Sequence, residues 1–120
     1  MTLKTLLEKY YLHDSAVINI SFEQENRQLI FKIEFAFWMQ EWYEPKLPEN
    51  GLAKLIFKNV YEYSGPIGNL DWLSIISVQE NSPDVLFILL EDDLNDKFYE
   101  ISFKTSSAEF VDLGIDTTDL

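Results

Sequence analysis

The clearest indication of the fold is the stretch Gln28-Leu29-Ile30-Phe31-Lys32-Ile33-Glu34-Phe35-Ala36-Phe37-Trp38-Met39. Large apolar residues occupy every second position from 29 to 39, whereas Lys32 and Glu34 lie on the opposite face. A hydrophobic period of two is typical of a β-strand with one face in the core. We therefore expect one long strand over residues 29–39, with a bulge or strong coiling along it.

The segments on either side of this strand continue the alternating pattern. In residues 16–23, one face carries Ala16, Ile18, Ile20 and Phe22, and we expect this face to be buried. Polar residues 25–28 supply a turn, so the first two strands are predicted to form a hairpin. An irregular segment with two prolines follows at residues 41–51. Further strands are predicted for residues 52–63, 70–79, 85–90, 98–105 and 109–113.

The first residues have the period of a helix instead. Leu3, Leu6, Leu7 and Tyr10 share one helical face, and Thr2 is a candidate N-cap. The predicted fold class is α+β and mainly β, with an antiparallel sheet of six or seven strands and one N-terminal helix. The sheet is expected to be curved, and closure into a barrel is one alternative. A single domain is predicted for residues 1–120, with the helix in 1–12, the sheet in 15–113 and a frayed acidic tail in 114–120.

Length and composition favour one folded domain without covalent cross-links. Of the 120 residues, 47% are hydrophobic and 15% aromatic, which is too rich for a disordered chain. The chain contains no cysteine, so disulfides, thiolate catalysis and cysteine-based zinc sites are excluded. The longest apolar run, residues 85–90, is too short to cross a membrane, and residues 1–7 do not resemble a signal peptide. A cytoplasmic location is therefore expected.

Acidic residues strongly outnumber basic ones. Twenty-one Asp and Glu against nine Lys and Arg give a formal net charge of −12. Nucleic acid and anionic lipid repel such a chain, so neither is an expected partner. No P-loop, dinucleotide fingerprint or spaced histidine pair occurs, and no cofactor or metal is predicted. The charge either serves solubility alone or attracts a basic protein partner.

The single histidine lies in the sequence Tyr11-Leu12-His13-Asp14-Ser15. His, Asp and Ser are the residue types of a hydrolase triad, but triad residues converge from separate parts of a fold, and these three are consecutive. We therefore interpret His13, Asp14 and Ser15 as a structural junction between the helix and the first strand, held by local hydrogen bonds. A small hydrolase with His13 as its base is the alternative.

The loop after the long strand is a candidate partner-binding surface. It combines aromatic anchors with acids in Glu41, Trp42, Tyr43 and Glu44. Aromatic side chains beside carboxylates suit a basic protein partner. In the alternative interpretation, Trp38 and Trp42 simply cover the end of the sheet.

A second acidic segment, Glu91-Asp92-Asp93-Leu94-Asn95-Asp96, follows an apolar run. It lacks the glycine at position six and the glutamate at position twelve of an EF-hand loop. A solvated hairpin turn is therefore favoured over a calcium site. Its acids Glu91, Asp92, Asp93 and Asp96 are further candidates for contact with a basic partner.

Two motifs resemble those of a group of small bacterial domains. The run Tyr11-Leu12-His13-Asp14-Ser15-Ala16-Val17, with the later Leu29-Ile30-Phe31-Lys32-Ile33, is similar to their "LHDS" junction between a short helix and paired strands. Lys54-Leu55-Ile56-Phe57-Lys58-Asn59-Val60 resembles their "x-F-x-N/D-V" strand. Most members are uncharacterised, and some look like immunity proteins of polymorphic toxin systems, of the immunity protein 50-like kind. The resemblance covers about the first half of the chain and implies no catalytic residues.

The leading functional hypothesis is a non-enzymatic acidic binding protein, and more narrowly an immunity protein that neutralises a cognate, basic toxin. It follows from the resemblance, from the net charge and from the lack of a catalytic constellation in the sequence. The alternatives are a small hydrolase that uses His13, and a scaffold or subunit protein that associates through an exposed sheet edge.

Overall fold

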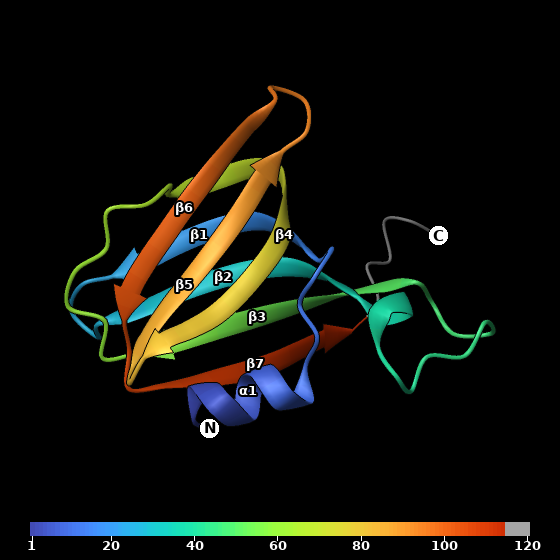
Figure 1. Cartoon of the computed structure of the whole chain (residues 1–120), viewed down its shortest axis with the longest axis horizontal. Coiled ribbons are helices and arrows are strands. Elements are labelled where there is room, and N and C mark those ends of the chain that lie inside the picture. Colours follow the sequence, from blue (N-terminus) through green and yellow to red (C-terminus); the bar gives the residue numbers. More distant parts are fainter. Residues whose placement is uncertain (115–120) are drawn as a thin grey trace.

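Seven antiparallel strands form one sheet in the computed structural model, which describes residues 1–114 (Figure 1). In chain order, the elements are α1 (Leu3–Lys9), β1 (Ala16–Glu23), β2 (Gln28–Ala36), the 3-10 helix η1 (Phe37–Met39), β3 (Asn50–Lys58), β4 (Gly68–Ser82), β5 (Val85–Asp92), β6 (Lys97–Lys104) and β7 (Ser107–Gly114). The strand order across the sheet is β6-β5-β4-β1-β2-β3-β7. The predicted mainly β fold with one N-terminal helix is confirmed.

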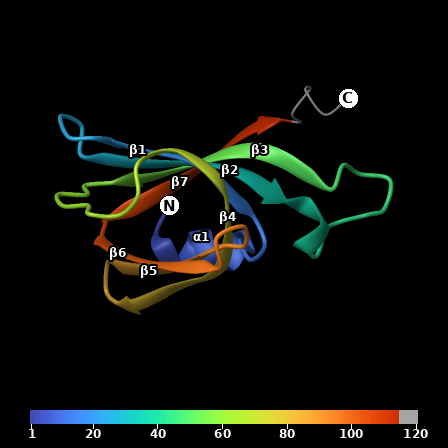
Figure 2. The same ribbon diagram turned by 90° about the horizontal axis from the view of Figure 1, so that it is seen from above.

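The sheet curves back on itself but stays open. Within residues 1–114, the outermost strands β6 and β7 do not pair with each other, so the sheet is not a closed barrel. The long strand β4 bends and carries β5 and β6 across the inner side of the other strands (Figures 1 and 2). The ring centroid of Phe103 in β6 lies 6.3 Å from that of Phe31 in β2 and 5.0 Å from that of Phe57 in β3. The half of the sheet that contains β5 and β6 and the half that contains β2 and β3 therefore share one hydrophobic core.

Helix α1 packs against β7 and β4. Its N-terminus is capped as predicted, because the Thr2 hydroxyl oxygen accepts a hydrogen bond of 3.1 Å from the Thr5 N–H. Leu3 and Leu6 are buried in the core, and burial of this apolar face holds so short a helix in place.

The helix is shorter than the predicted range 1–12. It ends at Lys9, because Tyr10 adopts an extended conformation. The Tyr10 ring instead stacks on Phe110 of β7, with centroids 3.9 Å apart and nearly parallel planes. Packing against the sheet thus overrides the local helical preference at this position.

A bulge at Ile18 corrects the predicted pattern of buried residues in β1. The register between β1 and β2 shifts between Val17 and Asn19, which leaves Ile18 as an extra residue. Val17 and Ile20 are buried, whereas Ala16 and Ile18 are only partly covered. The prediction that Ala16 and Ile18 face the core is therefore wrong.

Strand β2 ends three residues earlier than predicted. The N–H of Ala36 donates to the Ser15 Oγ, and its carbonyl accepts from the Gln40 Nε2, each at 2.9 Å. These side chains satisfy the backbone groups of Ala36 where the ladder with β3 ends. The chain then turns into η1, so Phe37 and Met39 do not extend the strand.

The other predicted strands are present with shifted ends. The strand predicted for residues 52–63 begins at Asn50 and ends at Lys58, because Asn59 adopts a left-handed φ of 58°. Strand β4 extends beyond the predicted range 70–79 at both ends. The predicted acidic tail begins at Gly114, the last residue of β7, and its residues 115–120 lie outside the described residues.

Candidate functional site

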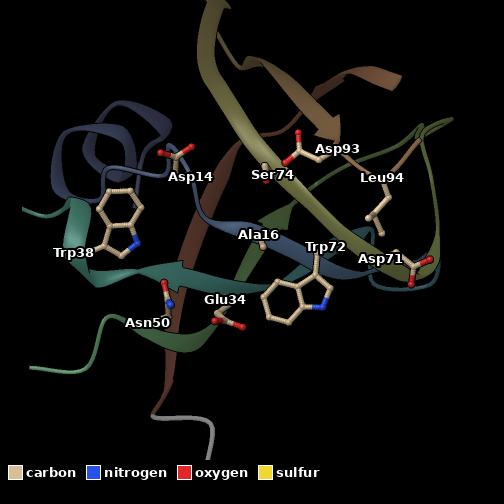
Figure 3. Close-up of a pocket in the computed structure, with 10 residues that line it drawn as sticks. All are labelled: Asp14, Ala16, Glu34, Trp38, Asn50, Asp71, Trp72, Ser74, Asp93 and Leu94. Carbon is tan, nitrogen blue, oxygen red and sulfur yellow. The ribbon is translucent and has the colours of Figure 1, made fainter. Parts of the chain in front are cut away.

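A row of three residues on neighbouring strands forms the floor of a depression on the outer side of the sheet. Ser74 in β4, Ala16 in β1 and Glu34 in β2 are direct neighbours across three strands. Ala16 faces this side because of the bulge at Ile18. The depression has a volume of about 480 Å³. We name it the tryptophan hollow, and it is lined by Asp14, Ala16, Glu34, Trp38, Asn50, Asp71, Trp72, Ser74, Asp93 and Leu94 (Figure 3).

Trp72 lines the hollow because β4 is irregular beside β1. Between Val17 and Asn19, β1 advances by two residues while β4 advances by four, so residues 70–72 lie opposite the single residue Ile18. Trp72 has a φ of 53°, in the left-handed region that bulky residues rarely adopt. It is 56% exposed. Uncommon backbone conformations of this kind cluster at functional positions.

Trp38 lines the hollow from the segment that follows β2. The turn η1 directs the chain away from the sheet, and the Trp38 N–H donates to the Glu49 carbonyl at 3.1 Å. Figure 3 shows Trp38 and Trp72 on either side of Ala16. Trp38 is 45% and Trp42 is 53% exposed, so all three tryptophans of the chain offer much of their surface to solvent. Tryptophan is well buried on average and is enriched at binding hot spots, so this exposure points to an interface.

The tryptophan hollow is strongly acidic. Four of its ten lining residues are Asp14, Glu34, Asp71 and Asp93, and none of the residues described at its surface is Lys, Arg or His. Carboxylates gathered around a concave surface create a negative potential that attracts cations. The combination of exposed indole rings and carboxylates therefore suits a positively charged group.

Carboxylates of the β5–β6 turn crowd one another beside the hollow. The pKa of Glu91 is raised above its ordinary value by a hydrogen bond with the Asp93 side chain, by desolvation, and by repulsion from Asp93 and Asp96. Such a shift means that the ionised form of Glu91 is disfavoured by its surroundings. A cation bound near Asp93 would relieve this repulsion.

Asp92 has a structural role, which corrects its prediction as a partner-binding residue. It is only 6% exposed, and its carboxylate accepts hydrogen bonds from the backbone N–H (3.3 Å) and the side-chain Nδ2 (2.8 Å) of Asn95. This local arrangement is typical of Asp in turns. The segment is a hairpin turn between β5 and β6, as predicted, and its exposed residue Asp93 lines the tryptophan hollow.

The predicted loop surface lies elsewhere. Glu41 and Trp42 line a separate depression of about 500 Å³ against α1. The Tyr43 hydroxyl donates to a backbone carbonyl of its own loop at 3.3 Å, and Glu44 forms an exposed ion pair with Lys46 at 3.2 Å. The two predicted partner-binding segments therefore contribute to different depressions.

The junction of His13, Asp14 and Ser15 is tied to two strands. The Nδ1 of His13 donates to the Ile76 carbonyl of β4 at 2.7 Å, and its Nε2 lies 3.5 Å from an Asp14 carboxylate oxygen. Ser15 is fully buried, and its Oγ accepts the N–H of Ala36 at 2.9 Å. The sequence predicts local hydrogen bonds here, but the main side-chain hydrogen bonds of His13 and Ser15 reach residues far away in the chain. The buried Ser15 hydroxyl is not presented to a substrate in this arrangement.

Replacing Ser15 with alanine is expected to lower the free energy of unfolding by about 1–3 kcal/mol, because the buried Ala36 N–H loses its acceptor. Replacing His13, which is partly exposed, is expected to cost less, about 1 kcal/mol. Urea denaturation of the two single variants measures both values. A larger loss for His13→Ala than for Ser15→Ala would contradict this assignment of roles.

Trp72 is one of the residues of the hollow that sequence patterns did not identify. Residues 70–79 have the composition of an ordinary strand. One signal is present, because Leu70 and Trp72 share one phase of the alternation whereas Leu73 and Ile75 share the other. A change of phase within an apolar strand indicates a bulge, and a bulge can re-aim a side chain.

No family model, curated protein or solved structure matches this chain. Among the described residues, no group of three or more His, Cys, Asp or Glu is placed to hold a metal ion. Within the same residues, no helix is both long and apolar enough to cross a membrane. The function is therefore inferred from the chemistry of the tryptophan hollow and from the sequence.

Proposed function

We propose that this protein is a non-enzymatic binding protein for a positively charged protein partner, and that the tryptophan hollow is the centre of the contact surface. The observation that carries the proposal is the presence of two exposed tryptophans and four carboxylates around one depression. Aromatic anchors supply contact area at interfaces, and complementary charge supplies orientation and speed of association.

The charge of the whole chain supports the same proposal. A net charge of −12 steers a basic partner toward the molecule from a distance. At short range, the carboxylates of the hollow and the neighbouring turn present a local negative surface. The long-range field accelerates the encounter, and the hollow determines which part of the partner docks.

A bacterial toxin that acts on nucleic acid is a fitting partner. Such a protein needs a basic surface to bind phosphate, and an acidic protein can occupy that surface in place of the nucleic acid. The resemblance of the LHDS junction to immunity protein 50-like domains supports this narrower role of an immunity protein. A cytoplasmic location is part of the proposal, because such a toxin would act on targets inside the cell.

The geometry of the junction supports binding rather than catalysis. A hydrolase would need an accessible nucleophile within reach of its base. The Ser15 hydroxyl is buried and engaged by a backbone N–H, and His13 donates to a backbone carbonyl of β4. These contacts favour a positioning role for both residues in the fold.

Co-purification with the products of neighbouring genes is expected to yield a basic protein that binds with micromolar or better affinity. Because charge steers the encounter, the association rate should fall by about tenfold or more between low and high salt. Surface plasmon resonance at several salt concentrations measures this dependence. Co-expression should also relieve the toxicity of the partner.

The absence of any such binder among the neighbouring products, together with no rescue of a toxic neighbour, would refute the proposed function. An affinity that does not change with salt would show that contact depends on apolar surface alone. In that case the carboxylates of the hollow would have no role in binding.

A further inference from the structure

We infer that the tryptophan hollow receives an arginine side chain of the partner, with the guanidinium stacked on an exposed indole and its N–H groups donating to the carboxylates of the hollow. This inference rests on the proposed function and names the group that the hollow recognises. It depends on three properties of the hollow: its depth, its aromatic walls and its charge.

The depth comes from the small residue in the middle of the floor. Ala16 lies between Ser74 and Glu34 in the row across β4, β1 and β2. Its methyl group leaves space above the sheet, while Trp38 and Trp72 stand on either side of it (Figure 3). A long, narrow side chain can therefore reach the floor, and the volume of about 480 Å³ leaves room for the backbone that carries it.

The aromatic walls favour a delocalised cation. A guanidinium is planar and weakly hydrated, so it stacks on an indole face with little loss of solvation. Trp38 and Trp72 are each about half exposed, and exposed indole surface is costly unless a partner covers it. Lysine offers a compact, strongly hydrated ammonium that gains less from such a wall.

The carboxylates favour a cation that can donate several hydrogen bonds at once. Asp14, Glu34, Asp71 and Asp93 reach the same hollow from four different segments of the chain. An arginine can stack and donate to several of these oxygens at once, because its five N–H groups lie in one plane. A lysine can approach one carboxylate only as a point charge. The joint presence of walls and carboxylates thus selects arginine.

The test uses the full-length protein and blocked Gly-Arg-Gly, Gly-Lys-Gly and Gly-Gly-Gly peptides. The indole N–H groups of the three tryptophans give separate NMR signals that Trp→Phe variants assign. With the arginine peptide in the millimolar range, the Trp38 and Trp72 signals should shift and approach saturation. The Trp42 signal is the internal control, because Trp42 lines a different depression.

The lysine peptide should produce shifts that are several-fold smaller at the same concentration, and the glycine peptide should produce none. Equal shifts for arginine and lysine would overturn the inference, since the hollow would then respond to charge alone. Shifts confined to Trp42, or no shifts at all, would overturn it as well.

Filling the hollow separates this inference from the proposed function. Ala16→Ile keeps every carboxylate and indole but occupies the floor, and it should lower the affinity for the co-purified partner by about tenfold. Ser21→Ile, on the same strand but outside the hollow, should leave the affinity unchanged. If the partner binds Ala16→Ile with normal affinity, the arginine site is wrong although the binding function stands. If no partner binds the unaltered protein, the proposed function itself fails.

Discussion

Reversing two carboxylates of the tryptophan hollow, by Asp71→Lys together with Asp93→Lys, is expected to weaken partner binding by about a hundredfold or more. Both residues are exposed and line the hollow. The replacements remove two attractive charges and place two repulsive ones opposite a basic partner, and like charges that face each other across an interface cost several kcal/mol. Isothermal titration calorimetry with the co-purified partner measures the change.

The matched control is Glu25→Lys together with Glu80→Lys. These two residues are also exposed, but they lie outside the hollow, and their reversal changes the net charge of the chain by the same amount. The control should slow association modestly through the long-range field and leave dissociation unchanged. If the control pair weakens binding as much as the hollow pair does, net charge rather than the hollow controls the interaction.

The largest effect on stability is expected for Phe31→Ala, with a loss of about 3–5 kcal/mol in the free energy of unfolding. The Phe31 side chain is fully buried. Its ring contacts Phe57 of the neighbouring strand, with centroids 5.5 Å apart, and Phe103 on the opposite side of the core. Truncation therefore leaves a cavity where the two halves of the curved sheet meet. Chemical denaturation followed by circular dichroism gives the value.

Phe98→Ala provides the comparison for this experiment. Phe98 belongs to β6, as Phe103 does, but it is 60% exposed. Its truncation should change the free energy of unfolding by less than about 0.5 kcal/mol. A loss below about 1 kcal/mol for Phe31→Ala would be incompatible with a core shared by both halves of the sheet.

Much of the strand pattern was predictable because it depends on local alternation. In β2, Phe31, Ile33 and Phe35 are buried as their spacing predicts, and in β6 the same holds for Ile101 and Phe103. A strand places successive side chains on opposite faces, so a run of alternating residues fixes which of them share a face. The helix start was predictable for a similar reason, since a Thr cap acts within one turn.

The errors occur where distant contacts override this local pattern. Ala36 ends β2 because side chains of Ser15 and Gln40 satisfy its backbone groups. Ala16 turns outward because Ile18 is an extra residue in the pairing of β1 with β2. A shift of one residue moves every following side chain to the other face of a sheet, so a single bulge is enough to reverse the expected burial.

The candidate site was predictable only in its chemistry. The acidic character and the high aromatic content follow from composition, and Asp93 was among the predicted binding residues. No sequence pattern predicts that Trp72, Glu34 and Asp14 lie close together. They share one hollow because β4, β1 and β2 lie side by side, an order that alternation within single strands does not specify.

The mainly β fold, the N-terminal helix and the strongly acidic charge could all be predicted before any tertiary contact was known. Each of these properties follows from the residue pattern or the composition of individual segments, without contacts between segments. The hollow, in contrast, depends on tertiary contacts: Ala16 forms part of its floor, and Trp38 and Trp72 stand on either side of Ala16. These positions could not be predicted, because the direction of a side chain depends on the register of its strand, and register is set by pairing between segments far apart in the chain.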